Sequence, residues 1–194
     1  DQVTFDRFSE CIPSLSGRKN LSQRDVIFTL TDMPLSKIHA VIRTFLSLVN
    51  VDIPELPVDD YRSCTWRDLE NAIKQNMMVG AHTLEHPLLS QESEEESRRQ
   101  ILGSYDRLVE KLGLVSKVFC YPVGRTADFG EKDRRIARNS GFVGAVSAEP
   151  GVASIDSNYY SVPRYALPSD KMNLIQYASW IESAKERLRG LRSH

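Results

Sequence analysis

The chain has 194 residues and a formal net charge of −1 at pH 7. This length suits one domain with a full core. The near-neutral charge, without a basic stripe interleaved with aromatic residues, argues against a nucleic-acid partner. No apolar run reaches about 18 residues, so we expect no membrane span. The three cysteines, Cys11, Cys64 and Cys120, are widely spaced, which favours free thiols over a disulfide framework.

The first 60 residues have helical and irregular patterns. Apolar residues from Phe5 to Leu15 indicate a short helix. The apolar run 26–30 fits either a strand or an apolar loop. Residues 38–49 are apolar at helical spacing, and Ser36 is a possible N-cap for that helix.

From Thr65 onward, helical and strand patterns alternate. In chain order we expect a helix after Thr65 with Asp68 completing its cap, a strand over 77–81, a helix from Ser93 to Gly113, a strand over 117–121, a helix over 130–140, a strand over 142–147 and a helix over about 170–189. Such alternation predicts parallel strands with helical crossovers. Ligands of such folds bind where the strands end, and both His82 and Pro122 follow expected strands.

Two of the four histidines, His82 and His86, stand four residues apart. On a helical turn this spacing brings both imidazoles to one face, where they can bind one metal ion. Zinc is the natural candidate because neutral imidazole suits it. The alternative is that both are ordinary polar residues at the start of a loop.

Several stretches in order resemble one family, the polysaccharide deacetylases. GAHTLEHPLLS over 80–90 resembles the family's second motif, H-[ST]-x-x-H. Residues 65–69 are similar to the segment that leads into it. FCYPVG over 119–124 resembles the third motif, F-x-Y-P-x-G, and VPR over 162–164 resembles a leucine-proline-arginine segment. The resemblance covers residues 57–168.

The resemblance implies an α/β fold, a partial, distorted (β/α) barrel of the polysaccharide deacetylase type with a helical N-terminal insertion. Residues 1–60 would be that insertion within the same domain, and residues 61–194 would form the deacetylase-like core.

The resemblance also implies a metal-dependent hydrolase that removes N-acetyl (or O-acetyl) groups from a polysaccharide or oligosaccharide through a metal-activated water. His82 and His86 carry over as ligands of Zn²⁺ or another divalent metal, and Thr83 as the residue that orients their loop.

The third motif would line the substrate groove. The backbone N–H of Val123 would donate to the oxyanion of the tetrahedral intermediate. Tyr121 and Pro122 would shape the sugar-binding wall. For Tyr121, an ordinary structural role at the end of a strand is an equally good interpretation. Arg164 would pair with a carboxylate in the site, or be a solvated arginine.

The family's first motif, T-F-D-D, supplies a base and a metal-binding aspartate, and it has no full match here. Residues 4–6 match three letters, but Arg7 stands where the metal ligand should be, and a cation repels zinc. Asp32 belongs to a looser match. We favour a first motif upstream of Asp1, outside this chain. The histidine that acts as general acid in the family's last motif is also not evident.

Two other functions compete with the enzyme. A relative without the aspartates would be a glycan-binding module, and a structural protein would use both histidines as ordinary polar residues. Free cysteines favour the cytoplasm, whereas the family often acts in the cell envelope.

Overall fold

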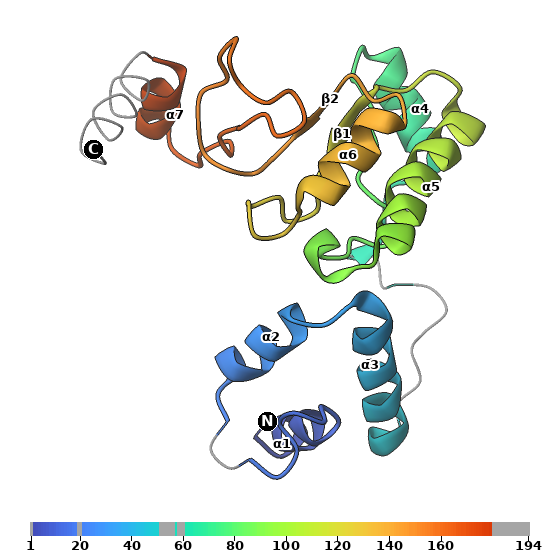
Figure 1. Cartoon of the computed structure of the whole chain (residues 1–194), viewed down its shortest axis with the longest axis vertical. Helices are drawn as coiled ribbons and strands as arrows, with labels where there is room; N and C mark the ends of the chain where they lie inside the picture. The colour runs from blue at the N-terminus through green and yellow to red at the C-terminus, as the bar shows by residue number, and fades with distance from the viewer. Residues whose placement is uncertain (1, 19–20, 51–56, 58–60, 180–194) are drawn as a thin grey trace. The chain divides into compact units, whose positions relative to one another are not determined.

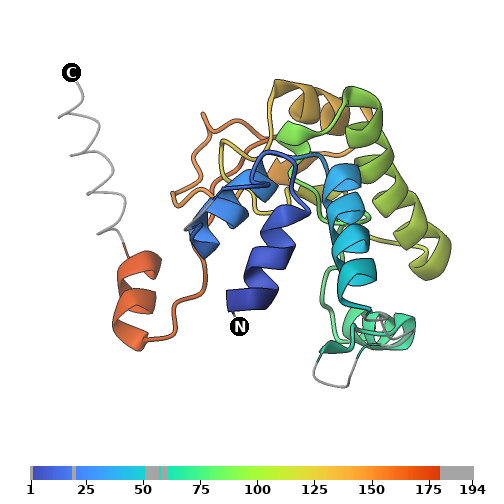
Figure 2. The same cartoon turned by 90° about the horizontal axis from the view of Figure 1, so that it is seen from below.

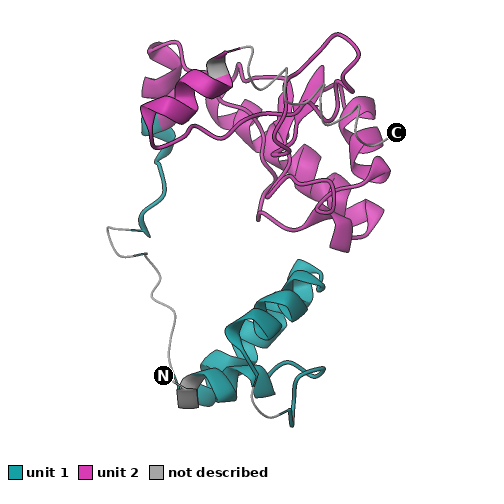
Figure 3. Ribbon diagram, turned by 90° about the vertical axis from the view of Figure 1, so that its left-hand side faces the viewer, with its two compact units in different colours: residues 1–68 teal, residues 69–194 magenta. Residues whose placement is uncertain are grey.

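The computed structural model describes residues 2–18, 21–50, 57 and 61–179. The chain divides into two compact units, residues 1–68 and residues 69–194 (Figure 3). Within the described residues, no helix has the length and apolar character needed to cross a membrane.

The first unit contains three helices, α1 (Gln2–Glu10), α2 (Gln23–Thr31) and α3 (Leu35–Val49). Helices α1 and α3 contact each other, and the Phe8 and Phe45 rings meet edge to face with centroids 5.0 Å apart. The buried core of this unit consists of Ile12, Leu15, Val26 and Val41. The unit therefore has a small apolar core of its own.

The apolar run 26–30 is helical, so our expectation of a strand or a loop was wrong. Ser22 and Asp25 form a capping box that begins α2: the Asp25 amide donates to Ser22 Oγ at 3.3 Å, and the Ser22 amide donates to Asp25 Oδ2 at 2.8 Å. Only Val26 of this helix is buried, while Phe28 is 70% exposed. The run is continuous because apolar residues occupy both faces of the helix. The next helix, α3, begins after Pro34 rather than at Ser36.

The second unit alternates helices with short strands. Its elements are α4 (Trp66–Lys74), which begins at the end of the first unit's range, the 3₁₀ helix η2 (Leu89–Gln91), α5 (Glu94–Leu112), β1 (Val118–Cys120), α6 (Glu131–Asn139), β2 (Gly144–Val146) and α7 (Lys171–Ala178). Thr65 and Asp68 cap α4 as expected. Gly113, with φ of 76°, ends α5. The expected final helix is confirmed over α7, and its remainder, 180–189, lies outside the described residues.

The strands form a short parallel arrangement. β1 pairs with β2 in parallel, with Phe119 opposite Ala145. Isolated parallel bridges join Gly80 to Ser116 and Val146 to Val162. The segment expected as a strand over 77–81 therefore contributes a single bridge. Among the described residues, the backbone bonds that join it to the neighbouring segment run from the Ser116 amide to Val79 and from the Cys120 amide to Ala81, which are too few for a regular ladder.

Of the ten described residues that are buried in the core beneath these strands, four are aromatic. The rings of Phe119 and Tyr121 meet edge to face at 5.2 Å, and Tyr121 stacks on Phe129 at 3.8 Å. Helices α5 and α6 contact each other and lie side by side in both views (Figure 1, Figure 2). Ile101 from α5 and Ile136 from α6 complete this core. These helices hold the strand ends in place.

A buried ion pair fastens α6 to its neighbours. Asp133 is 0% exposed, accepts from the Gly130 amide at 2.8 Å and pairs with Lys132 Nζ at 2.8 Å. Lys132 Nζ also donates to the carbonyl oxygen of Leu89 at 2.6 Å and to Ser97 Oγ at 2.8 Å. One ammonium group thus joins η2, α5 and α6, and all three of its donors are used.

We expect Asp133→Ala to lower the free energy of unfolding by about 3 kcal/mol. This is the lower end of the cost of breaking a buried pair, because Lys132 keeps 26% exposure and some hydration. Chemical denaturation measures the change. The exposed Glu131→Ala on the same helical turn is the control and should stay within about 0.5 kcal/mol of the wild type. Equal losses in both variants would contradict a special role for the buried pair.

Candidate active site

Four parallel segments of the second unit end at one edge, and the predicted site residues follow them. His82 comes after the segment bridged at Gly80, and Val123 comes after β1. Arg164 comes after the segment bridged at Val162, next to β2. The carboxyl ends of neighbouring parallel strands meet at the same edge of a sheet. The fold thus brings together three parts of the chain that are far apart in sequence.

The His82 imidazole is fixed by a backbone carbonyl of the neighbouring strand. Its Nδ1 lies 2.7 Å from the carbonyl oxygen of Cys120. A carbonyl oxygen only accepts, so Nδ1 must carry the proton and Nε2 keeps its lone pair in the neutral ring. The pKa of His82 is raised, chiefly by hydrogen bonding with the Cys120 side chain and to a smaller degree by this backbone bond, against the opposing effects of partial burial and the Arg164 charge. A histidine held at one nitrogen is ready to bind a metal through the other.

The loop from His82 to His86 is not the helical turn that we expected. Thr83 and His86 adopt left-handed backbone conformations, with φ of 65° and 57°. The Thr83 hydroxyl donates to the carbonyl oxygen of His82 at 2.6 Å and accepts from the His86 amide at 3.1 Å. The two imidazole rings meet edge to face with centroids 4.9 Å apart. The loop thus brings the histidines together by a different backbone path.

No third metal ligand joins the pair among the described residues. The described part of the chain has no group of three or more histidine, cysteine, aspartate or glutamate side chains suited to holding a metal ion. Asp6 lies in α1 and Asp32 follows α2, both in the first unit. The second unit supplies two imidazole nitrogens, which fits part of a zinc site.

Val123 occupies a strained backbone position at the end of β1. Its φ is 56°, which is uncommon for a β-branched residue, and its side chain is 50% exposed. Its N–H donates no hydrogen bond to the residues that the structure describes. The following Gly124 also has positive φ, and a Cβ there would meet the Ala148 amide nitrogen at 2.9 Å. The arrangement leaves the Val123 N–H available as a hydrogen-bond donor.

Hydrogen bonds on both sides hold this loop. The carbonyl oxygen of Gly124 accepts from the Ala148 amide at 2.7 Å. One carboxylate oxygen of Glu149 accepts from the amide of Thr126 at 2.6 Å and from its hydroxyl at 2.9 Å. These bonds lower the pKa of Glu149. The loop after β1 is therefore fixed to the loop after β2, which restrains Val123.

Tyr121 and Pro122 lie inside the protein rather than along a sugar-binding wall. Both side chains are fully buried. The Tyr121 hydroxyl donates to the carbonyl oxygen of Tyr160 at 2.9 Å, and burial raises its pKa. Direct contact of these side chains with sugar does not follow from this geometry. They support the loop that carries Val123 from below.

Arg164 is exposed, and its charge reaches the histidine edge. Burial by itself would raise the pKa of the Cys120 thiol, but hydrogen bonding between the thiol and the His82 side chain and the charge of Arg164 lower it. Arg164 also opposes protonation of His82. It forms no ion pair with any described residue, so the expected carboxylate partner is not found within that part of the chain. Its amide donates to the carbonyl oxygen of Glu149 at 3.0 Å.

Sequence reasoning missed three residues that hold this edge. They are Cys120, through its carbonyl oxygen, Glu149 and the buried Gln100 of α5. Every residue has a backbone carbonyl, so a contact made by this group cannot be predicted from residue type. Gln100 shares the buried stripe of α5 with the polar Ser97 and Ser104, three and four residues away, so the apolar pattern of the helix did not indicate its burial.

The family model for polysaccharide deacetylase matches residues 19–144, more than half of the chain. The chain belongs to the polysaccharide deacetylase family. This confirms the resemblance drawn from the histidine motif and the stretch over 119–124.

Individual relatives of this deacetylase-family chain are distant. The Bacillus subtilis (strain 168) protein named "Putative polysaccharide deacetylase YxkH" is 24% identical over 121 residues, which cover 62% of this chain and 42% of that protein. The chain thus spans less than half the length of this relative.

Two solved structures share the fold. The Streptococcus pyogenes deacetylase PplD, in complex with acetate, matches at a TM-score of 0.54 with 20% identity, covering 91% of this chain and 86% of that one. IcaB from Ammonifex degensii matches at 0.51 with 17% identity, covering 93% and 87%.

We expect neutral His82 to be the Nδ1–H tautomer, because only a donor fits the contact with the Cys120 carbonyl oxygen. Nitrogen-15 NMR of the imidazoles distinguishes the tautomers through the shifts of both ring nitrogens. The exposed His39 of α3 is the internal reference for an unconstrained ring, in which the Nε2–H tautomer dominates. An Nε2–H form at His82 would contradict the hydrogen bond.

Proposed function

We propose that this chain carries the histidine part of a metal-dependent hydrolytic site that removes N-acetyl, or O-acetyl, groups from a polysaccharide or oligosaccharide. The proposal is carried by one observation: the free Nε2 of His82 lies at the same strand edge as His86 and the unbonded N–H of Val123. Membership of the polysaccharide deacetylase family supports the class of substrate.

The donor atoms at this edge suit zinc or a similar divalent ion. Imidazole nitrogens are among its preferred ligands, and the His82 tautomer leaves Nε2 free to coordinate. When bound, such an ion supplies Lewis-acid polarisation of the acetyl carbonyl and a lowered pKa for bound water. His82 and His86 would hold it. That an aspartate upstream of Asp1 completes the ligand set stays a prediction.

The protein's own groups would serve the reaction in distinct ways. The Val123 N–H is a fixed donor for the oxyanion that develops as the acetyl carbon becomes tetrahedral. Thr83 holds the histidine loop through its two hydrogen bonds. Arg164, which forms no ion pair among the described residues, places a positive charge near His82 that favours negative charge developing on the substrate and the carboxylate product.

We also propose that the four parallel segments are part of the wall of a distorted (β/α) barrel. Support comes from their shared direction and from two deacetylase-fold structures that cover nine tenths of this chain. In this proposal residues 1–60 are a helical insertion in the same domain as residues 61–194.

A second candidate function rests on the missing third ligand. With only two imidazoles grouped in the described residues, the chain could hold a glycan without cleaving it. Metal affinity and acetate release separate the two functions.

We expect a zinc titration of this chain by calorimetry to show one binding site that is lost in the His82→Ala/His86→Ala variant. Acetate release from N-acetylated oligosaccharides, measured beside the titration, reports catalysis. His39→Ala, on the exposed face of α3, is the matched control and should bind zinc as the wild type does.

The strength of zinc binding indicates whether the third metal ligand lies within this chain. Tight one-to-one binding with acetate release would mean that a third ligand lies within these residues, with Asp6 and Asp32 as the first to substitute. Weak binding without acetate release would support a ligand outside this chain or a glycan-binding role. Zinc binding that survives the double substitution would refute the assignment of the histidines.

A further inference from the structure

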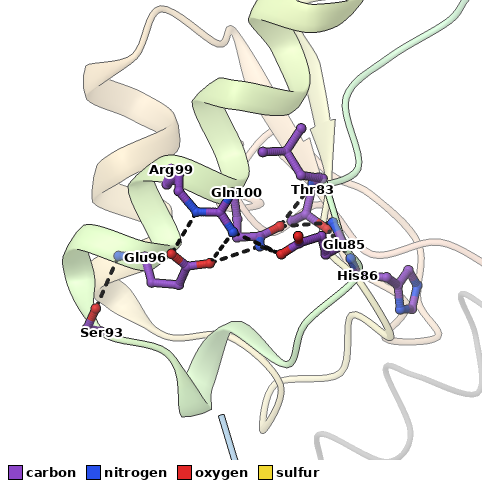
Figure 4. A network of polar contacts seen from close by, with 8 residues as sticks. Thr83, Glu85, His86, Ser93, Glu96, Arg99 and Gln100 are labelled. Atoms are coloured by element: carbon purple, nitrogen blue, oxygen red, sulfur yellow. Dashed lines mark hydrogen bonds and ion pairs between the residues drawn. The ribbon is translucent and has the colours of Figure 1, made fainter. Parts of the chain in front are cut away.

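The side chain of Gln100 is completely buried, and all of its hydrogen-bonding capacity is directed at the histidine loop and its neighbours (Figure 4). Its Oε1 accepts from the amides of Leu84 and Glu85, each at 3.0 Å. Its Nε2 donates to Glu85 Oε2 at 2.7 Å and to Glu96 Oε1 at 3.0 Å. Two acceptor sites and two donor hydrogens are all used.

The residues that Gln100 contacts lie between the two histidines. Leu84 and Glu85 separate Thr83 from His86, and both of these flanking residues have positive φ. Residues other than glycine hold such conformations only when surrounding contacts impose them. In the described structure those contacts are the Thr83 hydroxyl on one side and the Gln100 amide on the other.

We propose that Gln100 is the positioning residue of the metal site: by holding the Leu84–Glu85 backbone it fixes the distance and angle between the imidazoles of His82 and His86. This inference rests on the proposed metal-binding function. None of the Gln100 hydrogen bonds goes to either ring, and two of them go to the loop backbone, so its effect should appear in metal affinity and in the geometry of the histidines.

The surroundings of Gln100 require an amide at this position. A carboxylate could accept from the two backbone amides but would face Glu85 and Glu96 without a hydrogen to donate. Arg99 sits beside it and binds both carboxylates, reaching Glu96 at 2.6 Å and Glu85 at 2.9 Å. Arg99 thus offsets one of the two negative charges, while Gln100 connects both carboxylates to the loop.

A small residue on the same helix permits the close approach. A Cβ at Gly103 would lie 2.8 Å from Leu84 Cδ1, so a larger residue at this position would displace the Leu84 side chain from α5. The Gly103 contact and the Gln100 hydrogen bonds act on the same side of the loop, one turn of the helix apart. Both observations place α5 as the support on which the histidine loop rests.

The test compares zinc affinity in the intact chain and in Gln100→Leu. We expect zinc to bind about 10- to 100-fold more weakly in the variant, the range observed when residues supporting metal ligands are changed. Ile136→Val and Ile136→Ala are controls of graded stability, because Ile136 is buried in the same core but lies on α6. They should bind zinc like the wild type even where they lower stability as much as Gln100→Leu does.

A spectroscopic readout separates positioning from general loss of structure. In the metal-free protein, Gln100→Leu should speed hydrogen exchange at the Leu84 and Glu85 amides and shift the His86 imidazole resonances. The amides within β1 should keep their protection. A variant that failed to fold would lose protection in β1 as well, and Gln100→Glu would then replace it because its shape is unchanged.

Exchanging the amide at position 100 with the carboxylate at position 85 provides a test by restored zinc binding. Gln100→Glu should weaken zinc binding, because it removes the donor to Glu85. Adding Glu85→Gln should restore most of the affinity, because the amide at 85 can then donate to the carboxylate at 100. Glu96 keeps its two bonds from Arg99 in both variants.

Each outcome has one reading. Weaker binding in Gln100→Leu, unchanged binding in the Ile136 variants and recovery in the double variant support the proposal. Wild-type affinity in Gln100→Leu, or equal losses in the Ile136 variants, overturns it. If the wild-type chain itself binds no zinc, the proposed metal site fails and this inference fails with it, a result seen before any variant is compared.

Discussion

The hydrogen bond from His82 Nδ1 to the carbonyl oxygen of Cys120 is the constraint on which the site depends. It spans two neighbouring parallel segments, so it can form only when the segment before the histidine loop lies beside β1. Backbone bonds from the Cys120 amide to the Ala81 carbonyl oxygen, and from the Ser116 amide to that of Val79, set this pairing. Tertiary structure therefore selects the nitrogen that faces outward, and the chemistry of the histidine follows from strand pairing.

Backbone strain in the second unit concentrates at the same edge. Of its described residues other than glycine, those with positive φ are Asn76, Thr83, His86 and Val123, and the last three belong to the candidate site. Such conformations are retained when neighbouring groups hold them, and they commonly mark functional positions. Here Gln100 and the Thr83 hydroxyl hold the histidine loop, and Ala148 and Glu149 hold the loop of Val123. The rigid core beneath allows the strain to persist at the surface.

The parts of the fold that could be predicted from sequence are those set by local rules. The caps at Thr65 and Ser93, the glycine stop at Gly113 and the strand over 118–120 follow from side chains within a few residues of each position. The run 26–30 was misread because its apolar residues were counted without the Ser22–Asp25 capping box that precedes them. The buried state of Tyr121 depends on tertiary contacts with Phe129, beyond the turn after β1, and with Tyr160, far along the chain, so a strand-end tyrosine could not be distinguished from a substrate contact.

The candidate site likewise has a part that could be predicted from local sequence and a part that could not. One short loop can place two imidazoles together, and the motif that encodes it is readable because all its members are close in sequence. In the proposed metal site the loop supplies two imidazoles, and a third protein ligand would come from another segment of polypeptide. Two protein ligands alone would leave a bound ion largely hydrated, and its affinity would rise if further ligands were held at a fixed distance. If the proposed site binds metal, its affinity would depend on tertiary assembly as well as on the histidines, and a buried amide on α5 would influence that affinity without touching the ion.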